Sequence, residues 1–384
     1  MASPLAIRGS FRGYSGGDRT VRGFVQGLLR LGIEVELIDF PLWADLRLPP
    51  GQQPLVHRSL AAPERAPVVV QFCLPQQAER FAGRASVNFT MFELDRVPGF
   101  WLRHSLQQDH VVVPEASSRA AWLVDGFPPE RISLCPLGVD GERFRPGVPA
   151  LALGEARGRD VAAYRARFLN VSTIIPRKNL LGLLHVWLDA TRADDDAVLI
   201  LKLSHSGLAA ARLMRDLHLL ERRLGLSRER AAPLLFLDRR LGDDELPGLF
   251  AAATHYWSQS HGEGWDQPMT EAAVSGLRLI APDHTAYRAY LDTTVATLIP
   301  AVRAPARRID LEDDVDPAHY HRQFSAVPYW WVPDHDAAVA AVRSAINRRD
   351  EPRSRARERI LPFTWEAAAA RLAEIVGAVA TRSR

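Results

Sequence analysis

Two cationic side chains stand together where a buried strand is predicted to lead into a helix. Arg177 and Lys178 end the segment Ser172–Lys178, and the next helix is expected to begin at Asn179 or Leu180. A helix N-terminus already carries partial positive charge, so two cations there are unfavourable unless an anion is bound. A guanidinium fork and a compact amine at such a terminus can clamp a diphosphate. A solvated Arg-Lys turn is the alternative interpretation.

Two acidic side chains follow another predicted strand. Glu263 lies in a glycine-flanked loop after the strand His255–Ser258. Glu271 lies on a short helix that Pro268 is suited to begin and Gly276 to end. The two carboxylates can accept hydrogen bonds from two sets of hydroxyl groups, such as those of a sugar and of a ribose. A surface acid favoured by the helix dipole is the alternative for Glu271.

Two further segments follow predicted strands in the N-terminal half. Gly16 and Gly17 follow the first strand, where they permit close backbone approach to a ligand, although glycines also mark ordinary turns. Glu93 follows the strand Ser86–Thr90 and can accept a proton from an acceptor hydroxyl within hydrogen-bond reach. A salt-bridged or helix-capping role fits Glu93 equally well.

Short apolar strands alternate with longer amphipathic helices, which is the pattern of parallel sheets with crossover helices. The predicted strands of the N-terminal half are Leu5–Ile7, Glu34–Ile38, Val68–Phe72, Ser86–Thr90 and His110–Val113. Those of the C-terminal half are Phe168–Ser172, Ala197–Leu203, Leu234–Leu237, His255–Ser258 and Arg278–Ala281. Helices are predicted over Arg19–Arg30, Ser117–Asp125 and Thr364–Ala380, and an insertion over Val302–Val327. Such sheets bind ligands at the carboxyl ends of their strands, where the segments described above lie.

Length and composition narrow the class of protein. A chain of 384 residues favours two domains over one. The absence of a basic segment leading into an apolar run, and of any run of roughly 20 apolar residues, predicts a cytoplasmic protein. Cys73 and Cys135 are too few for a disulfide framework and fit a reducing compartment. His205, His255 and His284 lack metal-ligand spacing and are interpreted as structural residues.

The chain has a formal net charge of +3, and its basic residues are spread over its whole length. This distribution lacks the concentrated basic footprint of a nucleic-acid-binding protein. Arginine-rich surfaces and Trp101 allow peripheral contact with an anionic membrane.

Together these residues resemble the retaining glycosyltransferases of family 4. Glu263 and Glu271, with seven residues between them, look like the paired glutamates of that family, and Arg177–Asn179 looks like its phosphate clamp. Three further matches fall in the expected order: Pro136–Asp140 with Phe144 and Pro146, Leu241–Leu246, and Phe363–Glu366. The resemblance therefore covers nearly the whole chain.

The resemblance implies an α/β protein of the GT-B type, with two facing Rossmann-like domains and a cleft between them. Residues 1–160 would bind the acceptor, residues 161–362 the nucleotide sugar, and a final helix in 363–384 would cross back. The implied activity is metal-independent, retaining transfer of a hexose from a UDP- or GDP-linked donor, without a cofactor. The acceptor would be a glycan, a lipid-linked sugar or a small molecule. Bacterial glycan or exopolysaccharide synthesis, at the inner face of the membrane, is the setting expected by analogy.

The resemblance also implies roles for single residues. Arg177 and Lys178 would hold the diphosphate and, with the helix dipole, neutralise the charge of the leaving phosphate. Glu263 would bind the donor sugar and Glu271 the ribose. Gly264 and Trp265 would present backbone N–H groups. The expected substrate-binding residues also include Gly16, Gly17, His261 and Asp266.

The chain departs from the family pattern at two places. Many relatives have Gly-Arg at the strand end where this chain has Ser172–Thr173, so the role of that arginine is assigned to Arg177. Many relatives also place a histidine near the position of Glu93, whereas this chain has none until His104. The usual mechanism of the family lets the leaving phosphate take the proton, so a dedicated protein base is not required.

Other functions are compatible with parts of this pattern. A sugar-nucleotide epimerase, or a non-catalytic subunit that binds a sugar nucleotide or another protein, can share the same fold. A glycosidase can use two carboxylates, but an adjacent phosphate clamp argues against hydrolysis.

Overall fold

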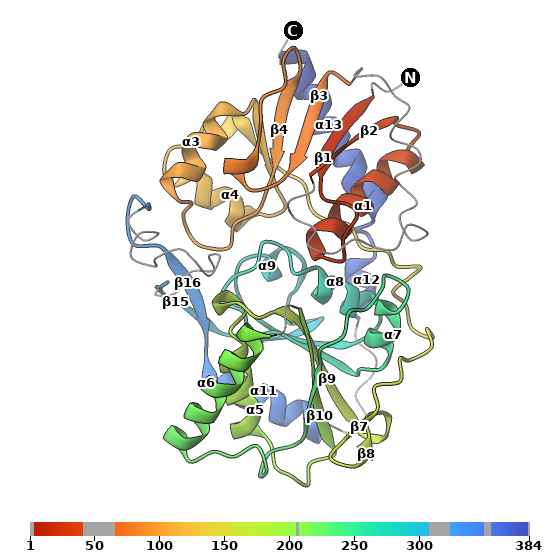
Figure 1. The fold of residues 1–384 in the computed structure, drawn as a ribbon, viewed down its shortest axis with the longest axis vertical. Helices are drawn as coiled ribbons and strands as arrows, with labels where there is room; N and C mark the ends of the chain where they lie inside the picture. The colour runs from red at the N-terminus through yellow and green to blue at the C-terminus, as the bar shows by residue number, and fades with distance from the viewer. Residues whose placement is uncertain (1–3, 41–65, 205–206, 307–322, 349–354, 383–384) are drawn as a thin grey trace. The chain divides into compact units, whose positions relative to one another are not determined.

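The computed structural model describes residues 4–40, 66–204, 207–306, 323–348 and 355–382 (Figure 1). The chain folds as two compact units. The first comprises the described residues of Met1–Asp140, Val315–Pro328 and Pro362–Arg384, and the second those of Gly141–Asp314 and Tyr329–Leu361. Each unit is built on a six-stranded parallel sheet. His205 lies outside the described residues.

The sheet of the first unit has the strand order β2-β1-β3-β4-β5-β6. Its strands are β1 (Leu5–Gly9), β2 (Val35–Asp39), β3 (Val68–Phe72), β4 (Ala85–Phe89), β5 (His110–Val113) and β6 (Ile132–Leu134). Its helices are α1 (Gly16–Arg30), α3 (Gly99–Gln107), α4 (Ala116–Leu123) and α13 (Trp365–Arg382). The five predicted strands are confirmed, because valine-rich runs such as Val68–Val70 are fully buried. The edge strand β6 was not predicted.

Helix α1 begins at Gly16, three residues before the predicted start at Arg19. Two polar side chains define this start. The Ser15 side chain accepts a hydrogen bond from the Asp18 amide, and the Asp18 carboxylate accepts one from the Ser15 amide, which forms a capping box. Asp18 also accepts a hydrogen bond from the Gly13 amide at 2.8 Å. The loop after β1 is therefore held by a buried carboxylate.

The sheet of the second unit has the order β11-β10-β9-β12-β13-β14. Its strands are β9 (Ala166–Thr173), β10 (Ala197–Ser204), β11 (Leu234–Leu237), β12 (His255–Trp257), β13 (Arg278–Pro282) and β14 (Ala296–Ile299). Its helices are α5 (Leu180–Ala190), α6 (Leu208–Leu224), α7 (Leu246–Ala251), α8 (Gln267–Val274), α9 (Tyr287–Tyr290), α11 (His335–Asn347) and α12 (Ala356–Ile360), with a 3-10 turn η6 (Pro176–Lys178). The five predicted strands are again confirmed.

Part of the predicted insertion Val302–Val327 belongs to a β-hairpin. Strand β15 (Ala301–Pro305) pairs antiparallel with β16 (Tyr329–Pro333), and residues 307–322 lie outside the described residues. A second short hairpin joins β7 (Glu155–Ala156) to β8 (Arg159–Asp160). Neither hairpin was predicted, because their strands are short and lack a long alternating pattern.

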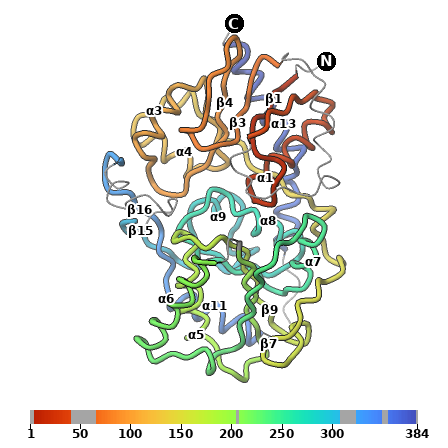
Figure 2. The backbone as a smooth tube through the Cα atoms, viewed as in Figure 1, coloured from red at the N-terminus to blue at the C-terminus, as the bar shows by residue number. Residues whose placement is uncertain are grey.

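The C-terminal helix α13 packs against α1 within the first unit (Figure 2). Thr364 caps α13 by accepting a hydrogen bond from the Ala367 amide at 3.0 Å. Two glycines of α1 permit the close approach, because a Cβ at Gly23 would overlap the Trp365 indole and a Cβ at Gly27 would overlap the Trp365 carbonyl. The Trp365 ring also meets Phe24 at a centroid distance of 5.5 Å.

Gly27→Ala is expected to lower the free energy of unfolding by roughly 1 to 3 kcal/mol, because the added methyl group would force α1 away from α13. Gly377→Ala, on α13, is the matched control. A Cβ there meets open space, so alanine should be neutral or stabilise the helix by up to about 1 kcal/mol. Urea unfolding of both variants tests this packing, and equal losses of stability would contradict it.

Candidate active site

Three loops of the second unit meet at the carboxyl edge of its sheet. They follow β9, β12 and β13, which are neighbours in the order β9-β12-β13. The connection from β9 leads to β10 on one side, whereas β12 lies on the other side, so a topological switch point separates β9 from β12. Open α/β sheets form their ligand sites at such points.

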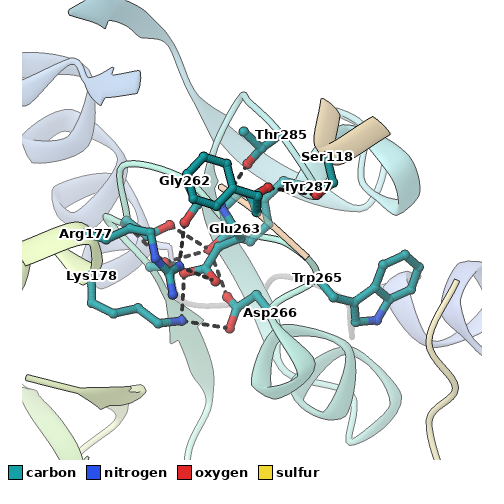
Figure 3. Close-up of polar contacts among 12 residues, drawn as sticks. Ser118, Arg177, Lys178, Gly262, Glu263, Trp265, Asp266, Thr285 and Tyr287 are labelled. Atoms are coloured by element: carbon teal, nitrogen blue, oxygen red, sulfur yellow. Dashed lines mark hydrogen bonds and ion pairs between the residues drawn. The ribbon is translucent and has the colours of Figure 1, made fainter. Parts of the chain in front are cut away.

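The loop after β9 is connected to the loop after β12 by ion pairs to the carboxylate of Glu263, which belongs to the β12 loop (Figure 3). Lys178 Nζ donates a hydrogen bond to Glu263 Oε1 at 2.7 Å, and Arg177 Nη1 donates to Glu263 Oε2 at 3.0 Å. Arg177 Nη1 also donates to the Gly262 carbonyl at 2.7 Å. The structure thus brings together three of the predicted catalytic residues, and Glu263 supplies the anion that two cations at this position require.

The charge state of Glu263 follows from these contacts. Its exposed fraction is only 3%. Burial alone would raise the pKa of the carboxyl group, but Lys178 and Arg177 outweigh burial, and the net shift of the Glu263 pKa is downward. Glu263 is therefore ionised at neutral pH.

Lysine is rare in this chain, because only two of its 48 basic residues are lysines. The general composition of the chain therefore does not account for the lysine at position 178.

Two hydrogen bonds to backbone carbonyl groups fix the distance between the two loops. The His261 amide donates to the Arg177 carbonyl at 2.7 Å, and Asn179 Nδ2 donates to the Gln259 carbonyl at 3.0 Å. Asn179 has a φ of 50°, a left-handed conformation that asparagine tolerates better than most residues, and α5 begins directly after it. The helix start expected at Asn179 or Leu180 is confirmed.

The loop after β13 supports Glu263 from a third direction. The Glu263 amide donates to Thr285 Oγ1 at 3.0 Å, and Thr285 Oγ1 lies 2.9 Å from His284 Nδ1. His284 Nε2 lies 2.9 Å from the Ser260 carbonyl oxygen, which can only accept, so Nε2 carries the proton and Nδ1 accepts from Thr285. Burial lowers the pKa of His284 to about 4, which keeps the ring neutral.

Sequence reasoning missed Thr285 and gave His284 no role at the site. Both follow β13 directly, so the rule that ligand sites form at strand ends was the available signal. Thr285 also has a φ of 41°, which is unusual for a β-branched residue.

Glu271 lies on α8, in the helix that follows the Glu263 loop. Its exposed fraction is 1%, so it is not the surface acid that the helix dipole alone would explain. Gly264 and Trp265 lie in the loop between the two glutamates. The Trp265 indole points away from the ion pairs (Figure 3), and the Trp265 carbonyl accepts a hydrogen bond from Tyr290 at 2.6 Å.

His261 is held by the hairpin strand β16. Its Nδ1 lies 2.9 Å from the Trp331 carbonyl oxygen, and its own carbonyl oxygen accepts from the Trp331 amide at 2.9 Å. The His261 ring also contacts Trp330, with a centroid distance of 4.3 Å. Burial lowers the pKa of His261 to about 4, so the ring is neutral. Contact of His261 with a donor remains a prediction.

The remaining predicted residues belong to the first unit. Gly16 and Gly17 form the exposed start of α1, and a Cβ at Gly16 would meet open space. Glu93 is half-buried in the loop after β4. Their roles remain predictions. The prediction that Trp101 contacts a membrane is wrong, because Trp101 is buried and its ring centroid lies 4.9 Å from that of Phe92.

Within the described ranges, no group of three histidine, cysteine, aspartate or glutamate side chains is arranged to hold a metal ion. No helix in the same part of the chain is both long and apolar enough to span a bilayer.

Comparisons with known proteins relate this geometry to a wider group. No family model matches the sequence, and no curated protein matches it. Several solved structures match over nearly their whole length. Anabaena HepE in complex with UDP and glucose has a TM-score of 0.59 and 13% identity, and covers 98% of this chain and 99% of its own. Sucrose-phosphate synthase from Thermosynechococcus elongatus has a TM-score of 0.60 and 15% identity over 98% and 99%. The apo structure of OtsA has a TM-score of 0.63 and 11% identity over 97% and 99%.

These matches span both units and share their two parallel sheets. The chain has the GT-B fold. The predicted fold class is thereby confirmed. The charged site lies at the switch point of the second unit, and the loop before Gly16 lies at the switch point of the first unit.

Glu263→Gln is expected to destabilise the protein by roughly 3 kcal/mol near neutral pH, because it leaves two partly buried cations without their counter-ion. Folding lowers the pKa of Glu263. The contribution of its charge to the free energy of unfolding is therefore present above the ordinary glutamate value of 4.5 and is lost as the pH falls through the lower folded value. Urea unfolding at pH 7 and pH 4 should therefore show a smaller difference between variant and wild type at pH 4.

Glu366→Gln provides the matched control for this prediction. Glu366 pairs with Arg30 at the surface, where an ion pair contributes about 1 kcal/mol or less. A Glu263→Gln variant as stable as Glu366→Gln at pH 7 would contradict a structural role for the buried ion pairs.

Proposed function

We propose that this GT-B protein is a glycosyltransferase that moves a hexose from a nucleoside-diphosphate sugar to an acceptor hydroxyl with retention and without a metal ion. One observation carries the proposal. At the switch point of the second unit, Arg177 and Lys178 converge on the buried carboxylate of Glu263, and a second buried carboxylate, Glu271, lies on the following helix. A structural ion pair would not require a second buried acid nearby.

The proposed roles follow from the charges. Arg177 and Lys178 bind the diphosphate, and the N-terminal amides of α5 add to the positive potential. Glu263 and Glu271 accept hydrogen bonds from hydroxyl groups, Glu263 from the transferred sugar and Glu271 from the ribose. When the donor binds, the two cations are shared between Glu263 and the phosphates.

The chemical step breaks the bond between the anomeric carbon and the phosphate oxygen and forms a bond from the same carbon to the acceptor oxygen. The acceptor attacks from the face that the diphosphate leaves, which retains the anomeric configuration. Its proton passes to the departing phosphate oxygen. Arg177 and Lys178 stabilise the negative charge that develops on that oxygen. Glu93 is an alternative acceptor for the proton in this proposal.

The similar structures suggest which donors to test first. One HepE structure is a complex with UDP-glucose, and a starch synthase IV structure from Arabidopsis thaliana contains ADP and acarbose. We infer a UDP-, GDP- or ADP-linked hexose as donor. The proposed acceptor is a glycan, a lipid-linked sugar or a small molecule in bacterial glycan synthesis, in a cytoplasmic protein that touches the inner face of the membrane through arginine-rich surfaces.

Purified protein should be stabilised by one nucleotide family in a thermal-shift screen with UDP, GDP, ADP, dTDP and their sugar conjugates. A ligand that binds the folded state at about 100 times its dissociation constant stabilises it by about 2.7 kcal/mol. EDTA should leave the shift unchanged. A shift abolished by EDTA would contradict metal independence, and no shift with any nucleotide at millimolar concentration would favour the non-catalytic interaction protein.

Lys178→Ala is expected to lower turnover by about a hundredfold or more, because it removes a charge that stabilises the leaving phosphate. The protein should still fold, since Arg177 continues to pair with Glu263. Arg223→Ala, at an exposed position on α6, is the control and should leave turnover unchanged. The measurement is release of nucleoside diphosphate from the donor identified in the screen. Near-normal turnover in Lys178→Ala would contradict the assignment.

A further inference from the structure

Asp266 occupies an unusual position beside the ion pairs. It is the N-cap residue of α8, with a φ of 60°, a left-handed conformation that costs a residue other than glycine energy. Aspartate at an N-cap normally accepts hydrogen bonds from the first helical amides. The Asp266 side chain makes no such bond. Backbone strain that a site retains, without the usual capping benefit, points to a role for the side chain itself.

The Asp266 carboxyl is directed at the phosphate-binding cations (Figure 3). Its Oδ2 accepts a hydrogen bond from the Tyr287 hydroxyl at 2.8 Å. Its Oδ1 lies 3.9 Å from Lys178 Nζ and, among the described residues, has no hydrogen-bond partner although it is buried. A buried carboxyl oxygen of this kind is unfavourable when charged.

The net charge of the cluster depends on Asp266. Arg177 and Lys178 contribute two positive charges, and ionised Glu263 contributes one negative charge. If Asp266 is also ionised, the four groups sum to zero and present no excess charge to an incoming diphosphate. If Asp266 carries a proton, the sum is +1. The same site therefore has two electrostatic states.

The tyrosines that interact with Asp266, and the histidines of the neighbouring loops, stay neutral near neutral pH. Burial raises the pKa of Tyr287, on α9, and of Tyr256, on β12, well above 10, so both stay neutral. His261 and His284 are neutral because burial lowers the pKa of each to about 4. Asp266 differs, because burial, opposed by Lys178 and reinforced by Glu263, raises its pKa to about 7.

We propose that donor binding is linked to protonation of Asp266, so that the site binds the diphosphate of a nucleotide sugar when the Asp266 carboxyl is neutral. This inference rests on the proposed function. The negative diphosphate disfavours a second anion beside Lys178, so binding is accompanied by uptake of a proton at Asp266. Neutral Asp266 still accepts the hydrogen bond from the Tyr287 hydroxyl. Its other oxygen, which has no hydrogen-bond partner among the described residues, is then available to form a hydrogen bond with the donor.

The sign of the pH dependence follows from this linkage. Donor binding raises the pKa of Asp266, so affinity is highest below the pKa of the free protein. Affinity falls as the pH rises through that value, and becomes constant above the pKa of the complex. An overall tenfold loss corresponds to a rise of roughly one in the Asp266 pKa on binding.

The test is calorimetric titration with UDP-glucose between pH 5.5 and 8.5, in buffers of different ionisation enthalpy. UDP-glucose is suitable because its diphosphate, esterified at both ends, does not titrate in this range. With a rise of roughly one in the Asp266 pKa, wild-type protein is expected to bind about sevenfold more weakly at pH 8.5 than at pH 6, and to take up about half a proton per donor near pH 7.5.

Asp266→Asn should remove both effects. Asparagine tolerates the left-handed backbone and still accepts the Tyr287 hydrogen bond, but it cannot ionise. Asp266→Gly, which relieves the backbone strain, is a second variant if the asparagine protein does not fold. Asp216→Asn, at a surface ion pair with Arg215 on α6, is the matched control and should keep the wild-type pH profile.

The possible outcomes separate this inference from the function on which it rests. Binding of UDP-glucose with the same pH profile and proton uptake in wild type and Asp266→Asn would overturn the role of Asp266 alone. Failure of wild-type protein to bind either UDP-glucose or inorganic pyrophosphate at any pH would overturn the diphosphate site and the Asp266 inference together.

Discussion

A buried carboxylate needs positive charge or hydrogen-bond donors next to it, and the buried carboxylate of Glu263 places this constraint on the second unit. Its two oxygens are compensated by Arg177 and Lys178, which arrive on a different loop. The two loops can meet because β9 and β12 are adjacent although more than 80 residues separate them in the chain. The loop after β13 then fixes the Glu263 backbone through Thr285. Strand order, loop conformation and charge balance are thus coupled at one side chain.

The two sheets place different chemistry at their switch points. In the second unit the groups are charged side chains on two loops, supported by the neutral side chains of Thr285 and His284 on a third. In the first unit the corresponding loop presents glycines, and its shape is maintained by a carboxylate, Asp18, that accepts hydrogen bonds from the Gly13 amide and the Ser10 hydroxyl. The same architecture therefore places charged side chains at one switch point and a glycine-containing loop held by a buried carboxylate at the other.

The sequence predicted the strands well because each is a compact apolar run, and Val68–Phe72, His110–Val113 and Leu234–Leu237 have the predicted bounds. The start of α1 was placed too late, because Gly16 and Gly17 are poor helix formers and the capping pair Ser15 and Asp18 was overlooked. Arg177, Lys178 and Glu263 were identified by residue type and by resemblance. The contacts of Thr285, His284 and Tyr287 were not predictable, since they depend on which strands become neighbours.

The packing of α13 on α1 affects the order in which the protein can fold during synthesis. The notch formed by Gly23 and Gly27 is filled by Trp365, a residue made more than 300 positions later. The ribosome therefore releases almost the entire second unit before the first unit can complete its core. Until then the side of α1 at Gly23 and Gly27 lacks its packing partner, although Phe24 on the same helix also packs against Phe72 and Phe89. Synthesis of the first unit is therefore completed only after that of the second, although its chain begins first.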